Sequence, residues 1–110
     1  MSNSIIIDEP EFHEMTDFIK GAQVRFTHSS TMTLAEWRFN PNTDLPEHSH
    51  PHEQITKVIS GTLELYSEGK TYVLQAGSVA VIPPNVIHSG KAVTECHIID
   101  AFYPVREDYR

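Results

Sequence analysis

Residues 48–61 read HSHPHEQITKVISG, and residues 77–88 read GSVAVIPPNVIH. In the first stretch, His48 and His50 are two positions apart, so in a β-strand both side chains point to one face. Gln54 has the same parity. The first stretch therefore offers two imidazoles and one amide to the same side of the chain.

The second stretch ends in another histidine, His88, which follows a proline-rich break. Three imidazoles and one amide oxygen are suitable ligands for one divalent transition metal. We exclude His52 from this set because Pro51 turns the chain before it. Two histidines on one strand face also occur as surface or hydrogen-bonded core residues, and that alternative stays open. The predicted metal ligands are His48, His50, Gln54 and His88.

Composition limits the class of protein. The chain has 110 residues, enough for one domain, and its net charge is 8 − 15 = −7. A surface this acidic repels phosphates, so we expect no nucleic-acid partner. The single cysteine cannot form an internal disulfide, and no apolar run approaches the ~20 residues of a membrane span. Since the N-terminus also lacks a basic leader, we expect a cytoplasmic protein with no membrane partner.

Short segments of alternating hydrophobicity, separated by turn residues, indicate β-strands along most of the chain. Such a series is typical of an antiparallel β-barrel or jelly roll, so the predicted fold is all-β in a single domain. Residues 9–20 have a loose helical spacing instead. We divide the chain into an N-terminal arm at 1–20 and a domain at 21–110. The predicted strands are 33–39, 55–60, 62–66, 71–74, 79–82 and 93–103.

Strand parity also predicts which residues line the interior. If Gln54 faces inward, Thr56 and Val58 do too. On the last strand Asp100 shares a face with apolar residues, where an unpaired carboxylate is costly. Asp100 therefore either caps a turn or pairs with an arginine, or it works as a general acid and base in the pocket.

Two arginines are candidate substrate ligands. Arg106 follows the last strand, and its planar fork suits a substrate carboxylate, although a solvated arginine in a charged tail is the alternative. Arg25, on an early strand, could also reach the mouth of the barrel. Phe102 could offer a stacking face to a sugar ring, whereas Trp37 is better explained as a core residue.

The two quoted stretches resemble the paired motifs of cupins, HxHx₃Ex₆G and Gx₅PxGx₂H. Gln54 stands at the usual Glu position and Asn85 at the second Gly of the later motif, where Asn tolerates a positive φ. The resemblance implies a cupin-type antiparallel β-barrel with the metal inside. Because Gln54 is neutral, we expect the ion to keep its full double charge and to act as a strong Lewis acid rather than as redox iron.

The tail DAFYPVRED at 100–108 is similar to that of KdgF-type cupins of pectin and alginate breakdown. This resemblance implies that Asp100 and Arg106 are catalytic and that Phe102 joins them. It implies linearisation of 4,5-unsaturated monouronates, small anionic sugar acids, to 5-keto-4-deoxyuronates. The cofactor would be one divalent ion of nickel, zinc, manganese or iron.

Other functions and the state of association stay open at this stage. A cupin can instead be a dioxygenase, a small-acid isomerase, or a non-catalytic metal- or sugar-binding protein. Small cupins are commonly homodimers, and we expect the same here. Ile5-Ile6-Ile7 suits an edge strand added to a partner's sheet, but it suits a strand of its own barrel equally well.

Overall fold

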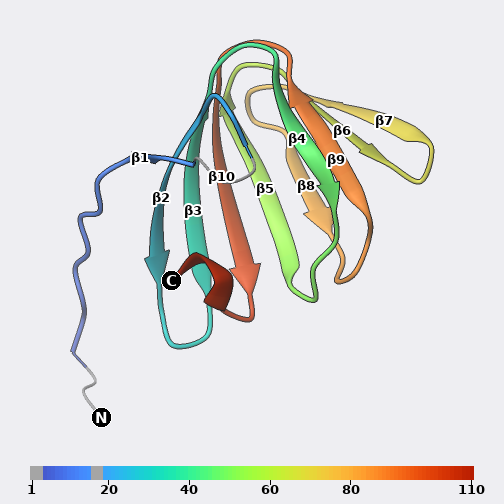
Figure 1. Ribbon diagram of the computed structural model, residues 1–110. Helices are drawn as coiled ribbons and strands as arrows, with labels where there is room; N and C mark the ends of the chain where they lie inside the picture. The colour runs from blue at the N-terminus through green and yellow to red at the C-terminus, as the bar shows by residue number, and fades with distance from the viewer. Residues whose placement is uncertain (1–3, 16–18) are drawn as a thin grey trace.

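The computed structural model describes residues 4–15 and 19–110. Within them the chain forms two antiparallel sheets that face each other (Figure 1), which confirms the predicted all-β fold.

The six-stranded sheet contains, in spatial order, β1 (His13–Glu14), β2 (Ala22–His28), β3 (Thr33–Phe39), β10 (Cys96–Tyr103), β5 (Glu53–Ser60) and β8 (Val79–Ile82). The four-stranded sheet contains β4 (Thr43–His48), β9 (His88–Ala92), β6 (Leu63–Ser67) and β7 (Lys70–Leu74). A short 3₁₀ helix, η1 (Glu107–Tyr109), follows β10.

The predicted alternation along the central strands is confirmed. On β5, residues 54, 56 and 58 are buried while 55, 57 and 59 are exposed, and on β10 buried residues alternate with half-buried ones as far as residue 102. The inward faces of the two sheets pack into one apolar core. Among the inward side chains of β10, Asp100 is the one carboxylate, and it is buried directly opposite Thr56 of β5.

Two strands of the smaller sheet escaped prediction, β4 and β9. The inward positions of β9 are His88, Gly90 and Ala92, of which only the small Ala92 is apolar. Gly90 is required there, because a Cβ would lie 2.6 Å from the carbonyl oxygen of Glu64 on the neighbouring strand. β4 carries two acidic residues and Pro46 within six residues. Their sequences therefore resemble loops although both strands are well paired.

Two predicted boundaries were wrong. The last strand was placed at 93–103, but residues 93–95 form a turn and β10 begins at Cys96. The helical spacing at 9–20 does not produce a helix in the part that the structure describes, where His13–Glu14 pairs with β2 instead. Residues 16–18 of that segment lie outside the described residues.

Backbone conformation explains two motif positions. Gly61 ends the first motif with φ +90°, and a Cβ there would overlap the backbone carbonyl oxygen of Glu95. Asn85 has φ 66°, so it adopts the left-handed conformation that its place in the second motif requires. The substitution of Asn for Gly at this turn is therefore accommodated, as the sequence predicted.

Residues 4–12 of the N-terminal arm run beyond the edge of the six-stranded sheet, on the side of β2 (Figure 1). The Phe12 ring contacts two guanidinium groups, with its centroid 4.4 Å from that of Arg25 and 3.9 Å from that of Arg38. Ile5, Ile6 and Ile7 are 90%, 86% and 78% exposed. They belong to no strand of the described chain, so their predicted place within the chain's own barrel is not observed.

The outer face of the six-stranded sheet also carries a cross-strand row of apolar side chains, the exposed Val81, Ile55 and Leu34 with the half-buried Ala101. An apolar row of this kind suits contact with another protein surface. The homodimer and the exchange of the arm stay predictions. No helix in the described parts of the chain is long and apolar enough to cross a membrane.

The glycine of the first motif yields a stability prediction. Gly61→Ala should lower the free energy of unfolding by about 3 kcal/mol or more, since it adds a backbone clash to the cost of a positive φ. Gly77→Ala is the matched control, because Gly77 has φ +91° but a Cβ added there would meet no atom within 4 Å, so it should cost only about 1–2 kcal/mol. Urea unfolding measures both, and equal losses would contradict the role assigned to Gly61.

Candidate metal centre

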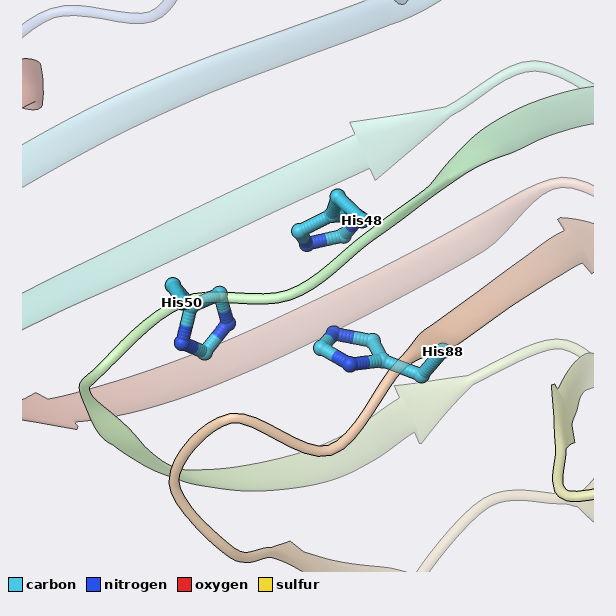
Figure 2. Close-up of side chains that lie close together, drawn as sticks. All are labelled: His48, His50 and His88. Atoms are coloured by element: carbon cyan, nitrogen blue, oxygen red, sulfur yellow. The ribbon is translucent and has the colours of Figure 1, made fainter.

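Three histidines from the two sequence motifs lie together at one end of the space between the sheets. His48 ends β4, His50 lies in the following loop and His88 begins β9, and their rings converge (Figure 2). One ring nitrogen from each lies within 4.8 Å of the others. The ring centroids of His48 and His88 are 4.3 Å apart. The convergence of the first two depends on the loop after β4 rather than on strand alternation, which corrects the sequence argument.

Backbone carbonyls orient all three rings. Nδ1 of His48 bonds the carbonyl oxygen of Pro46, and Nδ1 of His88 bonds that of Val86, each at 2.9 Å. Nδ1 of His50 bonds the carbonyl of His52 at 3.0 Å. A carbonyl oxygen can only accept, so each Nδ1 carries a proton, and in the neutral imidazole each Nε2 then keeps a lone pair. This is the arrangement that outer partners impose on metal-binding histidines.

The donor set fits a cation. Nε2 of His88 is buried and has no hydrogen-bond partner among the described residues. Nε2 of His50 lies 3.0 Å from Oε1 of Gln54, so two lone pairs face each other. A shared ion with bonds of about 2.1 Å would satisfy both atoms. His48, His50, His88 and the Gln54 oxygen are therefore suited to hold one divalent ion.

The electrostatics favour the neutral imidazoles that a metal needs. Burial, together with the positive charge of Arg106, lowers the pKa of His50 to about 4. Burial also lowers the pKa of His88. Neither ring has to lose a proton near neutral pH before it can bind a cation. His52, which the sequence argument excluded, is not part of the cluster.

Asp100 lies deeper in the same cavity. Its Oδ1 accepts a hydrogen bond of 2.6 Å from the hydroxyl of Thr56, so the buried carboxylate is satisfied by a neighbouring strand rather than by an arginine or a turn. Burial raises the pKa of Asp100 to about 6, against the lowering effect of the Thr56 hydrogen bond. A carboxyl with such a pKa exchanges a proton readily near neutral pH.

Arg106 is buried at the mouth of the cavity, which excludes the solvated-tail alternative. Its guanidinium lies 4.7 Å from the ring centroid of Phe102 and 4.1 Å from that of Tyr109. Its Nε and Nη2 donate to the two carboxylate oxygens of Asp108, at 3.0 and 2.8 Å. Phe102 and Arg106 both line the cavity that also contains Asp100, Gln54 and two of the histidines.

Arg25 is not brought to this site. It alternates with the inward residues of β2 and therefore points to the outer face, where its Nη2 lies 2.7 Å from Oε1 of Glu36. Parity along β2 would have shown this, because Val24 is the buried neighbour. The prediction that Arg25 binds substrate at the barrel mouth was wrong in its placement.

Sequence reasoning missed three contributors to the site. Thr56 was predicted to face inward, but its bond to Asp100 was not foreseen. Tyr109 and Asp108 hold Arg106 from η1, and no strand or helix periodicity marks a segment of three residues. The one available signal was the spacing of two between Arg106 and Asp108, an opposite-charge pair in a short tail.

Comparison with known proteins agrees with this geometry. Residues 35–102 match the family described as "Cupin domain". That match covers more than half of the chain and includes all four predicted metal ligands. The protein therefore belongs to the cupin family.

Two relatives carry the name KdgF. The chain is 29% identical to the pectin degradation protein KdgF of Dickeya dadantii, over 99% of each chain. It is 26% identical to KdgF from Halomonas sp., whose structure it matches with a TM-score of 0.86 over 99% of this chain and 100% of that one. An RmlC-like cupin from Shewanella frigidimarina, 23% identical with a TM-score of 0.85 and coverage of 100% and 97%, shows the fold alone.

The cluster predicts which histidine matters for metal binding. His88→Ala should weaken the affinity for Ni²⁺ or Zn²⁺ by more than about 100-fold, beyond what loss of an outer partner costs. His52→Ala is the matched control, since it removes a nearby imidazole but keeps the backbone carbonyl that orients His50. Competition with a chromophoric chelator measures both affinities. Equal losses in the two variants would exclude the proposed ligand set.

The raised pKa of Asp100 predicts a pH-dependent stability in the metal-free protein. Between the ordinary value of 3.8 and about 6, the folded chain binds more protons at Asp100 than the unfolded chain does. The contribution of Asp100 to stability is therefore present below that range and lost as the pH rises through it. Relative to Asp100→Asn, the wild type should lose up to about 3 kcal/mol between about pH 4 and pH 7.

Urea unfolding of both proteins with a chelator present measures this difference. The lowered pKa values of His50 and His88 make stability rise with pH, in the opposite direction to Asp100. Both proteins contain these histidines, so their effect cancels in the comparison. A difference in stability that does not change with pH would show that the carboxyl of Asp100 is not perturbed.

Proposed function

We propose that this cupin is a metal-dependent enzyme that opens the ring of 4,5-unsaturated monouronates, giving linear 5-keto-4-deoxyuronates. The observation that carries the proposal is the buried Asp100, with its raised pKa, in the same cavity as the histidine cluster and Arg106. A protein that only bound a metal or a sugar would have no need of a proton-exchanging carboxyl there. The similarity to two proteins named KdgF supports the same assignment.

The substrate is a cyclic enol ether that carries a carboxylate. Its conversion needs a proton on C4 and the oxygen of water on C5, which gives a hemiketal. The bond between C5 and the ring oxygen then breaks, the C5 hydroxyl loses its proton, and the ring oxygen gains one. The new hydroxyl at C1 leaves as water when the aldehyde forms. Atoms and electrons therefore balance as an isomerisation, without a redox cofactor.

Asp100 is the residue suited to move the protons. Near neutral pH both of its protonation states are populated, so it can give a proton to C4 and accept one later in the cycle. Thr56 keeps the carboxylate oriented through its short hydrogen bond. The ion held by His48, His50, Gln54 and His88 would supply Lewis-acid polarisation of the substrate's oxygens.

Arg106 is the residue suited to bind the substrate carboxylate. It gives the mouth of the cavity a buried positive charge in a protein of net charge −7. Asp108 already takes two of its N–H donors, so a substrate carboxylate would share the guanidinium with Asp108. Phe102, beneath the guanidinium, offers an apolar wall to the sugar ring.

The assay follows the ultraviolet absorbance of the C4=C5 double bond of unsaturated galacturonate with metal-loaded protein. We expect its loss above the spontaneous rate, and we expect a chelator to abolish the excess. Asp100→Asn should slow turnover by about 10²–10⁴-fold, the usual contribution of a general acid and base. Asp44→Asn, at an exposed position of β4, is the matched control and should retain the wild-type rate.

Binding measurements separate the enzyme from a non-catalytic cupin. Asp100→Asn should keep its affinity for the metal and for a saturated uronate while it loses turnover. If the wild type binds the uronate but never accelerates ring opening, the protein is a binding protein. Oxygen consumption with the substrate would favour a dioxygenase instead.

A further inference from the structure

A short chain of buried hydrogen bonds joins the histidine cluster to Asp100. Nε2 of Gln54 donates to Oγ1 of Thr56 at 2.9 Å, and the Thr56 hydroxyl donates to Oδ1 of Asp100 at 2.6 Å. Thr56 is only 2% exposed, so both hydrogen bonds of its hydroxyl are buried. Its side chain thus joins the amide beside the histidines to the carboxyl that exchanges protons, and the Gln54 side chain also acts on Asp100 directly.

The direction of these bonds follows from their ends. An ionised carboxylate can only accept, so the one proton of the Thr56 hydroxyl is committed to Asp100. The oxygen of Thr56 then has only lone pairs left for Gln54, and an amide can meet them only with its NH₂ group. Thr56 therefore selects the amide orientation in which the Gln54 oxygen faces Nε2 of His50.

The opposite orientation of the amide would damage the site twice. The Gln54 oxygen would then face the lone pairs of Thr56, which leaves two buried acceptors without a proton between them. The NH₂ group would face Nε2 of His50 and would occupy the lone pair that a cation needs. A glutamine ligand, unlike a glutamate, has this wrong orientation available, so it needs a residue that excludes it.

We propose that Thr56 is a positioning residue that turns the Gln54 amide oxygen toward the metal and couples this ligand to Asp100. The proposal rests on the metal-binding part of the proposed function but not on the identity of the substrate. Thr56 lines the same cavity but is not among the proposed metal ligands. Its hydroxyl acts through its two neighbours, Gln54 and Asp100.

The test compares variants that keep or remove the hydroxyl. Thr56→Val has nearly the same shape but no hydroxyl, and it should weaken the affinity for Zn²⁺ and Ni²⁺ by about 10–100-fold, the range for an outer partner of a metal ligand. Thr56→Ser keeps the hydroxyl and should bind both ions within about threefold of the wild type. Titration against a chromophoric chelator, without any substrate, measures these affinities.

A second threonine supplies the control for lost stability. Thr43 is also buried, and its hydroxyl bonds the backbone carbonyls of Asn40 and Gly21, away from the site. Thr43→Val should lower the unfolding temperature and leave metal affinity unchanged. If Thr56→Val proves unable to fold, Thr56→Ala carries the same expectation. A hydroxyl-free variant that folds and binds both ions as tightly as the wild type overturns the proposal.

A double-mutant cycle with Gln54→Glu tests the orientation itself. A carboxylate presents oxygen whichever way it is turned, so Thr56→Val should cost far less metal affinity in that background than in the wild type. Equal costs in both backgrounds would mean that Thr56 acts through packing, and the proposal would be wrong.

These outcomes are separable from those of the proposed function. A wild type that binds the metal but does not open unsaturated uronates sinks the enzymatic proposal and leaves the role of Thr56 intact. If the wild type opens unsaturated uronates but Thr56→Val binds the metal as tightly as the wild type, the enzymatic proposal stands and the role of Thr56 is overturned. A wild type that binds neither ion overturns both.

Discussion

Three short hydrogen bonds from imidazole to backbone determine what this site can bind. Each of His48, His50 and His88 places its Nδ1 against a carbonyl oxygen two residues away in the chain. The partner is main chain in every case, so the tautomer is set by local backbone conformation and not by a second side chain. With their protons committed in this way, the three rings present only lone pairs to the space between them. The Nε2 lone pairs of the three histidines therefore make this part of the cavity a place for a cation.

The other polar groups of the cavity, Arg106 and Asp100, also fit a site that holds a cation and exchanges protons. A cavity rich in lone pairs gains from cations, and the buried guanidinium of Arg106 supplies one at the mouth while lowering the pKa of His50. Asp100 stands further inside, where burial rather than a charged neighbour dominates its pKa. Neighbouring groups thus have their proton affinities pushed in opposite directions, the imidazole toward the neutral base and the carboxyl toward the neutral acid. Such a separation is typical of sites that move protons.

The sequence predicted the fold, and it predicted which residues converge wherever these lie on strands with regular alternation or in the two histidine motifs. Strand parity placed Gln54, Thr56 and Asp100 inside because the central strands alternate strictly. It failed for β9, whose inward residues are a histidine, a glycine and an alanine, because Gly90 allows close approach to β6 and only the small Ala92 adds an apolar side chain to the core. The contacts of Arg106 with Asp108 and Tyr109 also could not be predicted from the sequence pattern. They depend on three residues of 3₁₀ helix, a length at which no periodicity can be read.

Phe12 contacts the opposite face of the larger sheet from the one that carries the candidate site. Its ring is clamped by Arg25 and Arg38 on the outer face of the larger sheet, whereas the histidines and Asp100 occupy the inner face. The leading segment is thus anchored by groups that contribute nothing to the chemistry inside. A change in how this segment attaches to the sheet therefore acts on the outer surface and leaves the side chains of the cavity in place.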